Sequence, residues 1–241
     1  MIEVQNVSFG YGKEKVLRGI SCQMNSGEVV GLIGPNGAGK STLLRLTARI
    51  LKPQSGTIRV DGRDAAAYQT RAFARQLAFL PQSRPTPALN VRSLVMLGRF
   101  AHGRGDRQAV DKAIHTVGLD ALAQRDVRTL SGGQRQMAYL AMLLAQESPN
   151  VLLDEPFTHL DIGAQLDVAD VIRHMRNEGK CVAVVLHDLS MLERVCDRAV
   201  LLDKGQITFD GSAADCLRSD AVQKAFQVRI LENQGISFAK R

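Results

Sequence analysis

A short apolar run, Val29–Ile33, leads directly into a glycine-rich segment, and this succession limits the folds open to the chain. The segment fits the pattern G-x-x-x-x-G-K-[ST], which requires a strand before it and a helix after it. Leucines and then Ile50–Leu51 recur at helical spacing, and Lys52–Pro53 is expected to end that helix. Glycines let the backbone wrap phosphate groups, a lysine neutralises them, and a serine hydroxyl binds Mg²⁺. We therefore predict a phosphate-binding loop made of Gly34, Pro35, Asn36, Gly37, Ala38, Gly39, Lys40, Ser41 and Thr42.

Three further apolar runs each stop at a residue suited to phosphate chemistry. Gln82 follows residues 77–80, Asp154–Glu155 follows residues 151–153, and His187 follows residues 181–186. Continuous apolar strands separated by helices are typical of a mainly parallel sheet that is buried on both faces. Ligands of such sheets bind beyond the carboxyl ends of the strands. With the glycine loop included, four strand ends are expected to converge on one site.

The residues at these strand ends have distinct expected roles. Asp154 ends a buried strand and is expected to hold Mg²⁺, with Ser41 and Gln82 as further ligands. Glu155 is placed to polarise the attacking water, Gln82 to contact that water, and His187 to contact the γ phosphate and orient Glu155. Simpler explanations exist, because paired acids often cap strand ends, a lone glutamine is usually a loop residue and a lone histidine is usually structural. The shared position at strand ends favours the catalytic roles.

A second glycine stretch, Leu130–Gln134, opens a predicted helix. The free backbone N–H groups and the dipole at a helix start attract phosphate oxygens. Ser131, Gly132, Gly133 and Gln134 are therefore a candidate second anion site. Two phosphate-binding elements with one water-activating carboxylate indicate an ATPase that works by joining two copies of itself.

The N-terminal part is predicted to be antiparallel β structure. Ile2–Phe9 and Val16–Met24 are expected strands, and Gly10–Gly12 is the expected turn between them. Tyr11 lies in this turn, where it either stacks on adenine or is an ordinary exposed tyrosine. The pattern predicts another strand at Thr57–Val60 and a hairpin with its turn at Lys204–Gly205.

Residues 85–147 are predicted to form an inserted helical subdomain, because helical patterns prevail there without a convincing strand. Residues 1–84 and 148–241 are expected to supply the β-subdomain and the nucleotide-binding core, so that 1–241 is a single domain. The expected helices are Val91–Leu97, Ala109–Val117, Gly133–Ala145, Ala164–Asn177 and Leu189–Cys196.

Composition restricts the partners and the compartment. The start of the chain shows no secretory signal and no apolar run is long enough to cross a bilayer, so any membrane role is expected to be peripheral. Four cysteines without metal-ligand spacing indicate reduced thiols in a cytoplasmic protein. The net charge of +7 includes seven arginines between Ala65 and Arg107, which form either a solvated face or a docking surface. Few aromatics interleave with them, and no nucleic-acid partner is expected.

These segments together resemble the ATP-binding cassette (ABC) transporter ATPases over nearly the whole chain. Gly34–Ser41 matches the Walker A motif, Val151–Glu155 the Walker B motif and Leu130–Gln134 the signature. The matches at single positions are Gln82 for the Q-loop, His187 for the H-loop, Tyr11 for the adenine-stacking A-loop and Asp161 for the D-loop.

The resemblance implies an α/β P-loop NTPase of the RecA-like type, with ATP and Mg²⁺ as cofactors. It also implies two cassettes packed head to tail, so that Ser131 and Gly133 cap the ATP held by Lys40 of the other copy. The implied partners are an integral membrane permease, on which the helical subdomain docks, and a periplasmic or surface substrate-binding protein. The implied location is the cytoplasmic face of the membrane.

Within that family the chain looks like an importer subunit for iron–siderophore, haem or cobalamin chelates. Leu97–His102, Leu160–Ile162 and Val185–Leu189 are similar to that branch, whereas Ala101, Met137 and Phe157 depart from it without removing a catalytic group. The alternatives are another transporter branch and a soluble ABC ATPase that serves nucleic acid. A P-loop GTPase or kinase is disfavoured, because no N-K-x-D motif occurs.

Overall fold

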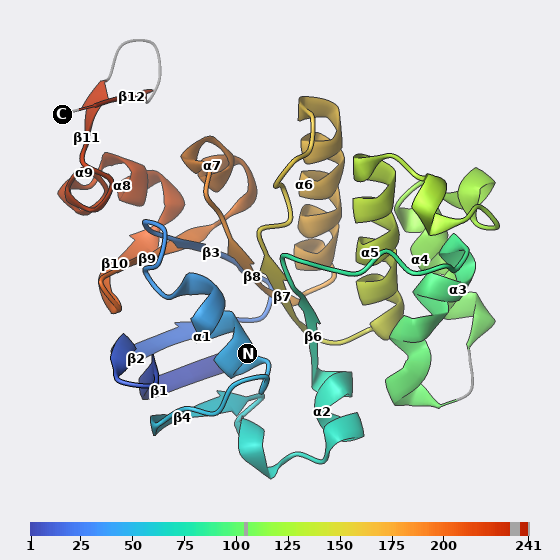
Figure 1. Cartoon of the computed structure of the whole chain (residues 1–241), viewed down its shortest axis with the longest axis horizontal. Helices are drawn as coiled ribbons and strands as arrows, with labels where there is room; N and C mark the ends of the chain where they lie inside the picture. Colours follow the sequence, from blue (N-terminus) through green and yellow to red (C-terminus); the bar gives the residue numbers. More distant parts are fainter. Residues whose placement is uncertain (104–105, 232–236, 241) are drawn as a thin grey trace.

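The structure is a computed structural model that describes residues 1–103, 106–231 and 237–240. At its centre lies a six-stranded sheet with the order β10-β9-β3-β8-β7-β6 (Figure 1). All neighbours from β9 to β6 pair in parallel, and only β10 pairs antiparallel, with β9. The mainly parallel sheet expected from the apolar runs is thus confirmed. Its strands are β3 (Val29–Ile33), β6 (Leu77–Leu80), β7 (Asn150–Asp154), β8 (Cys181–Val185), β9 (Arg198–Asp203) and β10 (Gln206–Ser212).

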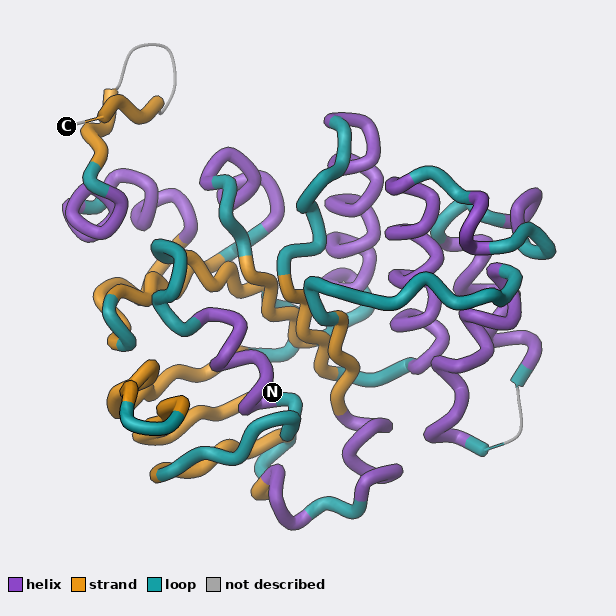
Figure 2. Tube along the Cα trace, viewed as in Figure 1, coloured by secondary structure: helices purple, strands orange, loops and turns teal. Residues whose placement is uncertain are grey.

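Both faces of this sheet are covered, which explains why its central strands are apolar at consecutive positions. Every residue of β3, β7 and β8 is buried. Val182 and Val184 pack into a hydrophobic cluster with helices α5 (Gly132–Gln146) and α6 (Ile162–Asn177). Ala183 and Val185 pack into a second cluster with helix α1 (Lys40–Thr47) and the N-terminal strands. Successive strand side chains point to opposite faces, so an unbroken apolar run satisfies both clusters. Figure 2 shows helices on the two sides of these strands.

A second, antiparallel sheet with the order β2-β1-β4-β5 lies on the α1 side. The predicted turn between its first strands is displaced: β1 continues through Tyr11, which pairs with Glu14, so the turn lies at Gly12–Lys13. Gly12 has a φ of 61°, which suits a two-residue hairpin loop. The strands are β1 (Ile2–Tyr11), β2 (Glu14–Met24), β4 (Ser55–Val60) and β5 (Arg63–Asp64).

Helix α1 (Lys40–Thr47) is shorter than the leucine spacing predicts. Arg49 has a left-handed backbone with a φ of 59°, and its N–H bonds to the carbonyl of Leu46 in a tighter turn. The chain therefore leaves the helix before Ile50, whose side chain is 59% exposed. The prediction that the helix continues through Ile50–Leu51 was wrong. An apolar residue at helical spacing is not necessarily buried, and it does not by itself extend a helix.

The segment between β6 and β7 is helical throughout its regular structure, as predicted. Leu94, Ile114 and Leu140 are buried between its helices and belong to the same hydrophobic cluster as the central sheet. Helix α2 (Thr70–Gln76), before β6, is an element that the sequence patterns do not indicate, because it buries only Phe73. The helical segments are α3 (Val91–Met96), α4 (Arg107–Thr116) and α5 (Gly132–Gln146), with 3₁₀ helices η2 (Leu97–His102), η3 (Asp120–Leu122) and η4 (Val127–Thr129).

The C-terminal third returns to the central sheet. The predicted helix at Leu189–Cys196 is two short pieces, and the predicted hairpin at Lys204–Gly205 joins β9 to β10. No helix of the described residues is long and apolar enough to cross a bilayer. The remaining elements are η1 (Ala65–Ala67), α6 (Ile162–Asn177), η5 (Leu189–Met191), α7 (Leu192–Val195), α8 (Ala213–Arg218), α9 (Asp220–Phe226), β11 (Val228–Leu231) and β12 (Ser237–Lys240).

The close packing of η2 on α5 yields a test of the fold. A Cβ atom at Gly98 would lie 2.1 Å from the carbonyl oxygen of Met142, so Gly98→Ala must push η2 away from α5. We expect the free energy of unfolding to fall by about 1–3 kcal/mol, measured by urea denaturation. Gly163→Ala is the matched control, since its Cβ would meet only Asp161 Oδ1 at 3.5 Å in a helix. Equal stability of the two variants would contradict the packing described.

Candidate functional site

The carboxyl ends of β3, β6, β7 and β8 meet at one cavity of about 760 Å³. The structure thus brings together the polar residues that the sequence places at four separate strand ends. The lining residues are Tyr11, Glu14, Val16, Asn36, Gly37, Gly39, Lys40, Ser41, Thr42, Gln82, Glu155, Thr158 and His187.

The glycine loop can take its shape only without side chains at two positions. Gly34 has a φ of 144°, and a Cβ there would lie 2.0 Å from the carbonyl oxygen of Leu202. Gly39, with a φ of 102°, precedes α1, and its Cβ would collide with Leu17. The loop consequently wraps around the start of α1, where free N–H groups suit phosphate oxygens.

Lys40 lies inside this loop with only 5% of its surface exposed. Its Nζ donates hydrogen bonds to the carbonyl oxygens of Gly34 (2.7 Å) and Pro35 (2.9 Å). Burial lowers the pKa of Lys40, and the nearby Glu155 and Asp154 carboxylates oppose that shift. A desolvated ammonium held this way is prepared to exchange carbonyl acceptors for anionic phosphate oxygens.

Asp154 and Ser41 form a group of oxygens that fits a hard divalent cation. The Ser41 hydroxyl donates a 2.7 Å hydrogen bond to Asp154 Oδ1. Asp154 Oδ2 is buried and accepts no hydrogen bond from the residues that the structure describes. Burial raises the pKa of Asp154, since a buried carboxylate lacks compensation by water, and the Ser41 hydrogen bond opposes the rise. Carboxylate and hydroxyl oxygens are the ligands that Mg²⁺ prefers, so these residues fit the predicted metal.

Glu155 is held by three side chains. Gln82 Nε2 donates a 2.5 Å hydrogen bond to Glu155 Oε2, Thr158 Oγ1 donates to the same oxygen at 3.2 Å, and His187 Nε2 contacts Oε1. Glu155 also has a left-handed backbone with a φ of 54°, which is uncommon for a residue with a side chain and is found often at functional sites. The turn after β7 therefore aims this carboxylate into the cavity.

Thr158 is a site residue that the sequence reasoning missed. Its hydroxyl contacts Glu155 and it lines the cavity. The available signal was its position three residues after Glu155, in the turn that follows a strand end.

Tyr11 lies at the entrance of the same cavity. Its ring is 49% exposed and packs edge-on against Phe9, with 5.0 Å between ring centroids. The last pair of β1 and β2 thus presents an aromatic face to the space beside the glycine loop.

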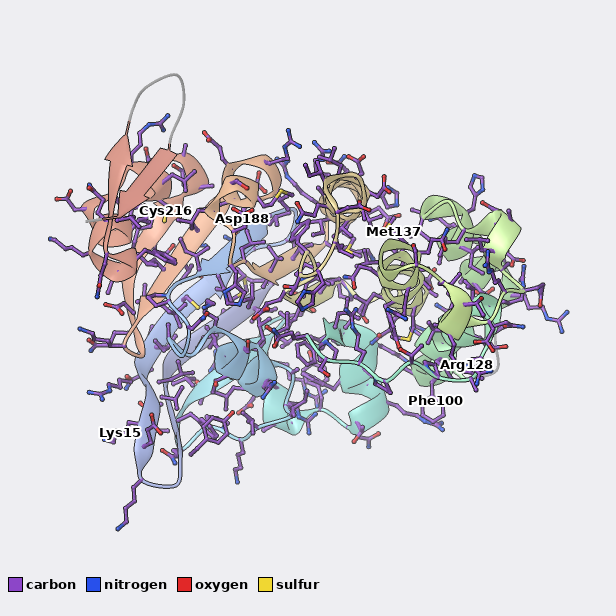
Figure 3. The ribbon with its side chains drawn as sticks, turned by 45° about the horizontal axis from the view of Figure 1, so that its top comes forward. Lys15, Phe100, Arg128, Met137, Asp188 and Cys216 are labelled. Carbon is purple, nitrogen blue, oxygen red and sulfur yellow. The ribbon has the colours of Figure 1, made fainter. Side chains whose placement is uncertain are left out.

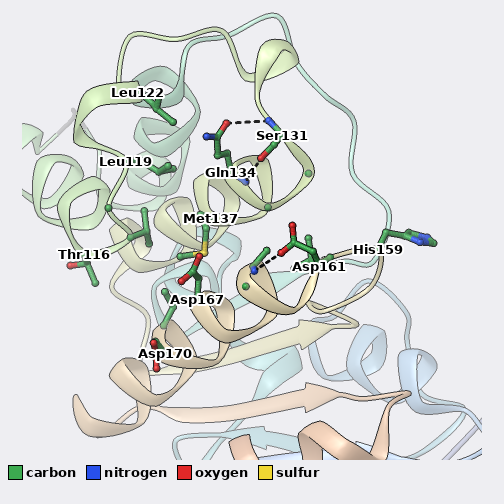
Figure 4. A pocket seen from close by; sticks show the side chains of 18 of the residues that line it. Thr116, Leu119, Leu122, Ser131, Gln134, Met137, His159, Asp161, Asp167 and Asp170 are labelled. Carbon is green, nitrogen blue, oxygen red and sulfur yellow. Dashed lines mark hydrogen bonds between the residues drawn. The ribbon is translucent and has the colours of Figure 1, made fainter.

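Ser131, Gly132, Gly133 and Gln134 line a different cavity, of about 840 Å³ (Figure 4). Ser131 caps α5 reciprocally with Gln134: Gln134 N–H donates to Ser131 Oγ, and Ser131 N–H donates to Gln134 Oε1, both at 3.2 Å. Asp161 lines this cavity too and caps α6 by accepting a 2.8 Å hydrogen bond from the N–H of Ala164. No described residue lines both this cavity and the glycine-loop cavity. Within one chain, the two predicted anion sites do not meet.

The arginine-rich stretch does not form one free basic face, because most of its members bond within the fold. Arg71 and Arg107 make no hydrogen bond or ion pair with the described residues, and Arg71 lies over the exposed ring of Phe100 at 5.7 Å. Arg104 lies outside the described residues. The engaged pairs are Arg75 with the Ala101 carbonyl, Arg84 with Gln136, Arg92 with Asp111, and Arg99 with Glu147.

Comparison with known proteins identifies the class to which this fold and site correspond. The family model for ABC transporters matches residues 17–158. The ferric enterobactin transport ATP-binding protein of Escherichia coli (strain K12) is 36% identical, with 94% of this chain and 87% of that protein covered. The petrobactin import ATP-binding protein of Bacillus anthracis is 37% identical, with 98% and 90% covered. The hemin import ATP-binding protein of Rhodopseudomonas palustris (strain ATCC BAA-98 / CGA009) is 36% identical, with 98% and 91% covered.

Solved structures agree with this assignment. An ATP-binding cassette in its ADP conformation superposes with a TM-score of 0.85 at 21% identity, covering 94% of this chain and 98% of the other, which supports the fold. A structure described as a metal-chelate type ABC transporter, in an inward-facing conformation, superposes with a TM-score of 0.82 at 27% identity, covering 99% and 95%. The chain belongs to the ABC transporter family and is an ATP-binding ATPase subunit.

The buried carboxylate of Asp154 generates a pH prediction. Because its pKa is raised in the folded state, ionisation costs stability above that pKa, and the cost disappears as pH falls toward the ordinary value of 3.8. We expect Asp154→Asn to raise the free energy of unfolding of the nucleotide-free protein by about 1 kcal/mol at pH 8. The gain should shrink on acidification.

Urea denaturation at pH 8 and at pH 4, close to the ordinary pKa of 3.8, measures this difference. Asp167→Asn, at an exposed position of α6, is the control and should change little. A destabilised Asp154→Asn protein at pH 8 would refute the interpretation of the buried carboxylate.

Proposed function

We propose that this chain is the ATP-hydrolysing subunit of an importer for a metal chelate, acting through a separate membrane permease. The observation that carries the proposal is the separation of the two anion sites into two cavities, together with relatives named for siderophore and hemin import. Iron–siderophore, haem or cobalamin chelates are the proposed cargo. The proposed location is the cytoplasmic face of the membrane, with a periplasmic or surface binding protein delivering the cargo.

In the proposed reaction, residues 34–42 bind the phosphates of ATP, and Lys40 releases the Gly34 and Pro35 carbonyls to contact the terminal phosphates. Ser41, Asp154 and Gln82 would hold Mg²⁺, which would supply charge neutralisation at those phosphates. Tyr11 stacks on the adenine. This assignment is supported by the buried position of Lys40 and by the exposed ring of Tyr11 at the mouth of the cavity.

Glu155 is the proposed general base for the attacking water. Hydrogen bonds from Gln82 and Thr158 fix its carboxylate, and His187 contacts its other oxygen, beside the place of the γ phosphate. A base held by three partners loses little freedom when the substrate binds, which favours a reactive orientation.

Two copies are proposed to complete each ATP site. The start of α5 offers the backbone N–H groups of Gly132 and Gly133 and the Ser131 hydroxyl, and it contacts the nucleotide of the partner rather than its own. Gln134 holds Ser131 in place through the reciprocal cap. Asp161, which caps the neighbouring helix α6, lies at the same interface.

Residues 85–147 are the proposed helical subdomain, inserted into the core made of residues 1–84 and 148–241. Its outer surface carries Phe100 and Leu97, which are 71% and 52% exposed, beside Arg71. Figure 3 shows Phe100 projecting from this end of the molecule. An exposed apolar pair next to a free arginine fits a permease loop that has apolar and acidic side chains.

Mixing two inactive variants tests the shared site. Lys40→Ala lacks the phosphate contact of its own chain, and Ser131→Arg blocks the contact with the partner's ATP. We expect each variant alone to lose ATPase activity by about tenfold or more, because charge-assisted phosphate contacts are strong. Their mixture should regain activity, since one of the two sites in a mixed dimer has both residues intact. A mixture as inactive as its components would refute the two-copy site.

Uptake of labelled chelates in the source cells tests the transport function. Loss of the gene should abolish uptake of one chelate class. A gene carrying Glu155→Gln should fail to restore that uptake, because a general base contributes roughly 10²- to 10⁴-fold in rate.

A second variant tests the docking surface. Phe100→Asp should lose both chelate uptake and co-purification with the permease in detergent while keeping basal ATPase activity. Ile50→Asp, at another exposed apolar residue, is the control. Normal uptake of all three chelates without the gene would reject the assignment.

A further inference from the structure

The last residue pair of the β1–β2 hairpin contributes two side chains to the glycine-loop cavity. Tyr11 of β1 and Glu14 of β2 are directly opposite each other, and both line that cavity. Directly opposed residues of an antiparallel pair point to the same face of the sheet. The carboxylate of Glu14 therefore lies beside the ring that is proposed to stack on adenine.

Strand β2 forms a wall of the cavity between the entrance and the glycine loop. Glu14 and Val16 are two residues apart on this strand, so they share one face, and both line the cavity. The carbonyl oxygen of Val16 is close to the loop, only 3.3 Å from the place that a Cβ atom on Gly39 would take. A nucleotide with its base on Tyr11 and its phosphates in the loop would have its ribose along this wall, next to Glu14.

The carboxylate of Glu14 has no partner within the described part of the chain. Its side chain is exposed and makes no hydrogen bond or ion pair there, although Lys13 and Lys15 are its neighbours in sequence. A free carboxylate repels the phosphates of a bound nucleotide. It therefore weakens nucleotide binding unless it also accepts hydrogen bonds from the ligand.

The ribose of ATP carries the donors that this carboxylate can use. Its 2′ and 3′ hydroxyls are adjacent and both can donate, so a single carboxylate can accept from the pair. Acidic residues bind ribose hydroxyls in this way in dinucleotide-binding folds. The amino group of adenine is also a donor, but it lies on the edge of the base opposite the sugar and is directed away from the ribose. The position of Glu14 therefore favours the sugar over the base.

We propose that Glu14 is a specificity-determining residue that accepts hydrogen bonds from the 2′ and 3′ hydroxyls of the ribose of ATP. The chain thereby prefers a nucleotide with both hydroxyls to one whose sugar lacks them. This inference rests on the proposed ATP site.

The affinities for ATP and for 2′,3′-dideoxy-ATP test this role, measured by calorimetric titration with Mg²⁺ in a Glu155→Gln background. The two ligands have the same base and the same phosphates, so the ratio of their affinities isolates the two hydroxyls. We expect the chain that retains Glu14 to bind ATP about tenfold more tightly, because hydrogen bonds to a charged acceptor are strong. Glu14→Ala should reduce this preference to about twofold or less. Glu14→Gln should lie between the two, since its amide oxygen still accepts.

Glu3→Gln is the matched control, because Glu3 is a carboxylate of the same sheet that does not line the cavity. It should leave the preference unchanged. If Glu14→Ala changes the affinity for both ligands by the same factor, the carboxylate acts only through its charge and the proposal is wrong.

A third ligand, purine riboside triphosphate, separates the sugar from the base, because it lacks only the amino group of adenine. If Glu14→Ala keeps the preference for the hydroxyls and loses a preference for that amino group, Glu14 contacts the base and the proposal is overturned. Failure of the proposed ATP site gives a different result. In that case ATP would bind the Glu155→Gln chain no more tightly than the same chain with Lys40→Ala.

Discussion

Burial of the parallel sheet on both faces is the constraint on which the rest of the molecule depends. β3, β7 and β8 have no exposed residue, so polar groups can appear only where these strands end. Parallel pairing then brings those ends to one edge, and Lys40, Glu155 and His187 meet there although they are far apart in sequence. The location of the site follows from the parallel direction of the strands. Its chemistry follows from the polar residues that come directly after the buried strands.

Burial at this edge of the sheet also explains why the pKa values of Lys40 and Asp154 are shifted. Lys40 and Asp154 are taken out of water by the glycine loop and by β7, and burial shifts the pKa of each toward its neutral form. The charged forms of both side chains are therefore more stable when a polyanion and a divalent cation bind together than when the cavity holds water alone. The proposed preference for a metal-bound nucleotide follows from the burial of Lys40 and Asp154.

Much of this arrangement could be predicted from local patterns. The strands, the glycine loop, the helix after Ser131 and the convergence of Gln82, Glu155 and His187 all follow from periodicity and from the positions of strand ends. Predictions were wrong where the fold overrides the pattern. Ile50 fits helical spacing, yet the chain turns at Arg49 and exposes it. Four arginines that look like a surface charge cluster instead hold helices and loops together.

The sequence by itself determined the family and predicted the phosphate-binding elements, because both depend on residues that are neighbours in the chain. Only the tertiary structure decided that the start of α5 lies in a cavity separate from the glycine loop, which is the observation behind the proposed two-copy site. The tertiary structure also decided the left-handed backbone of Glu155, which directs its carboxylate into the cavity. It likewise decided the contact between Arg84 and Gln136 of α5. Such features arise from the packing of segments that are distant in sequence, and spacing along the chain carries no record of that packing.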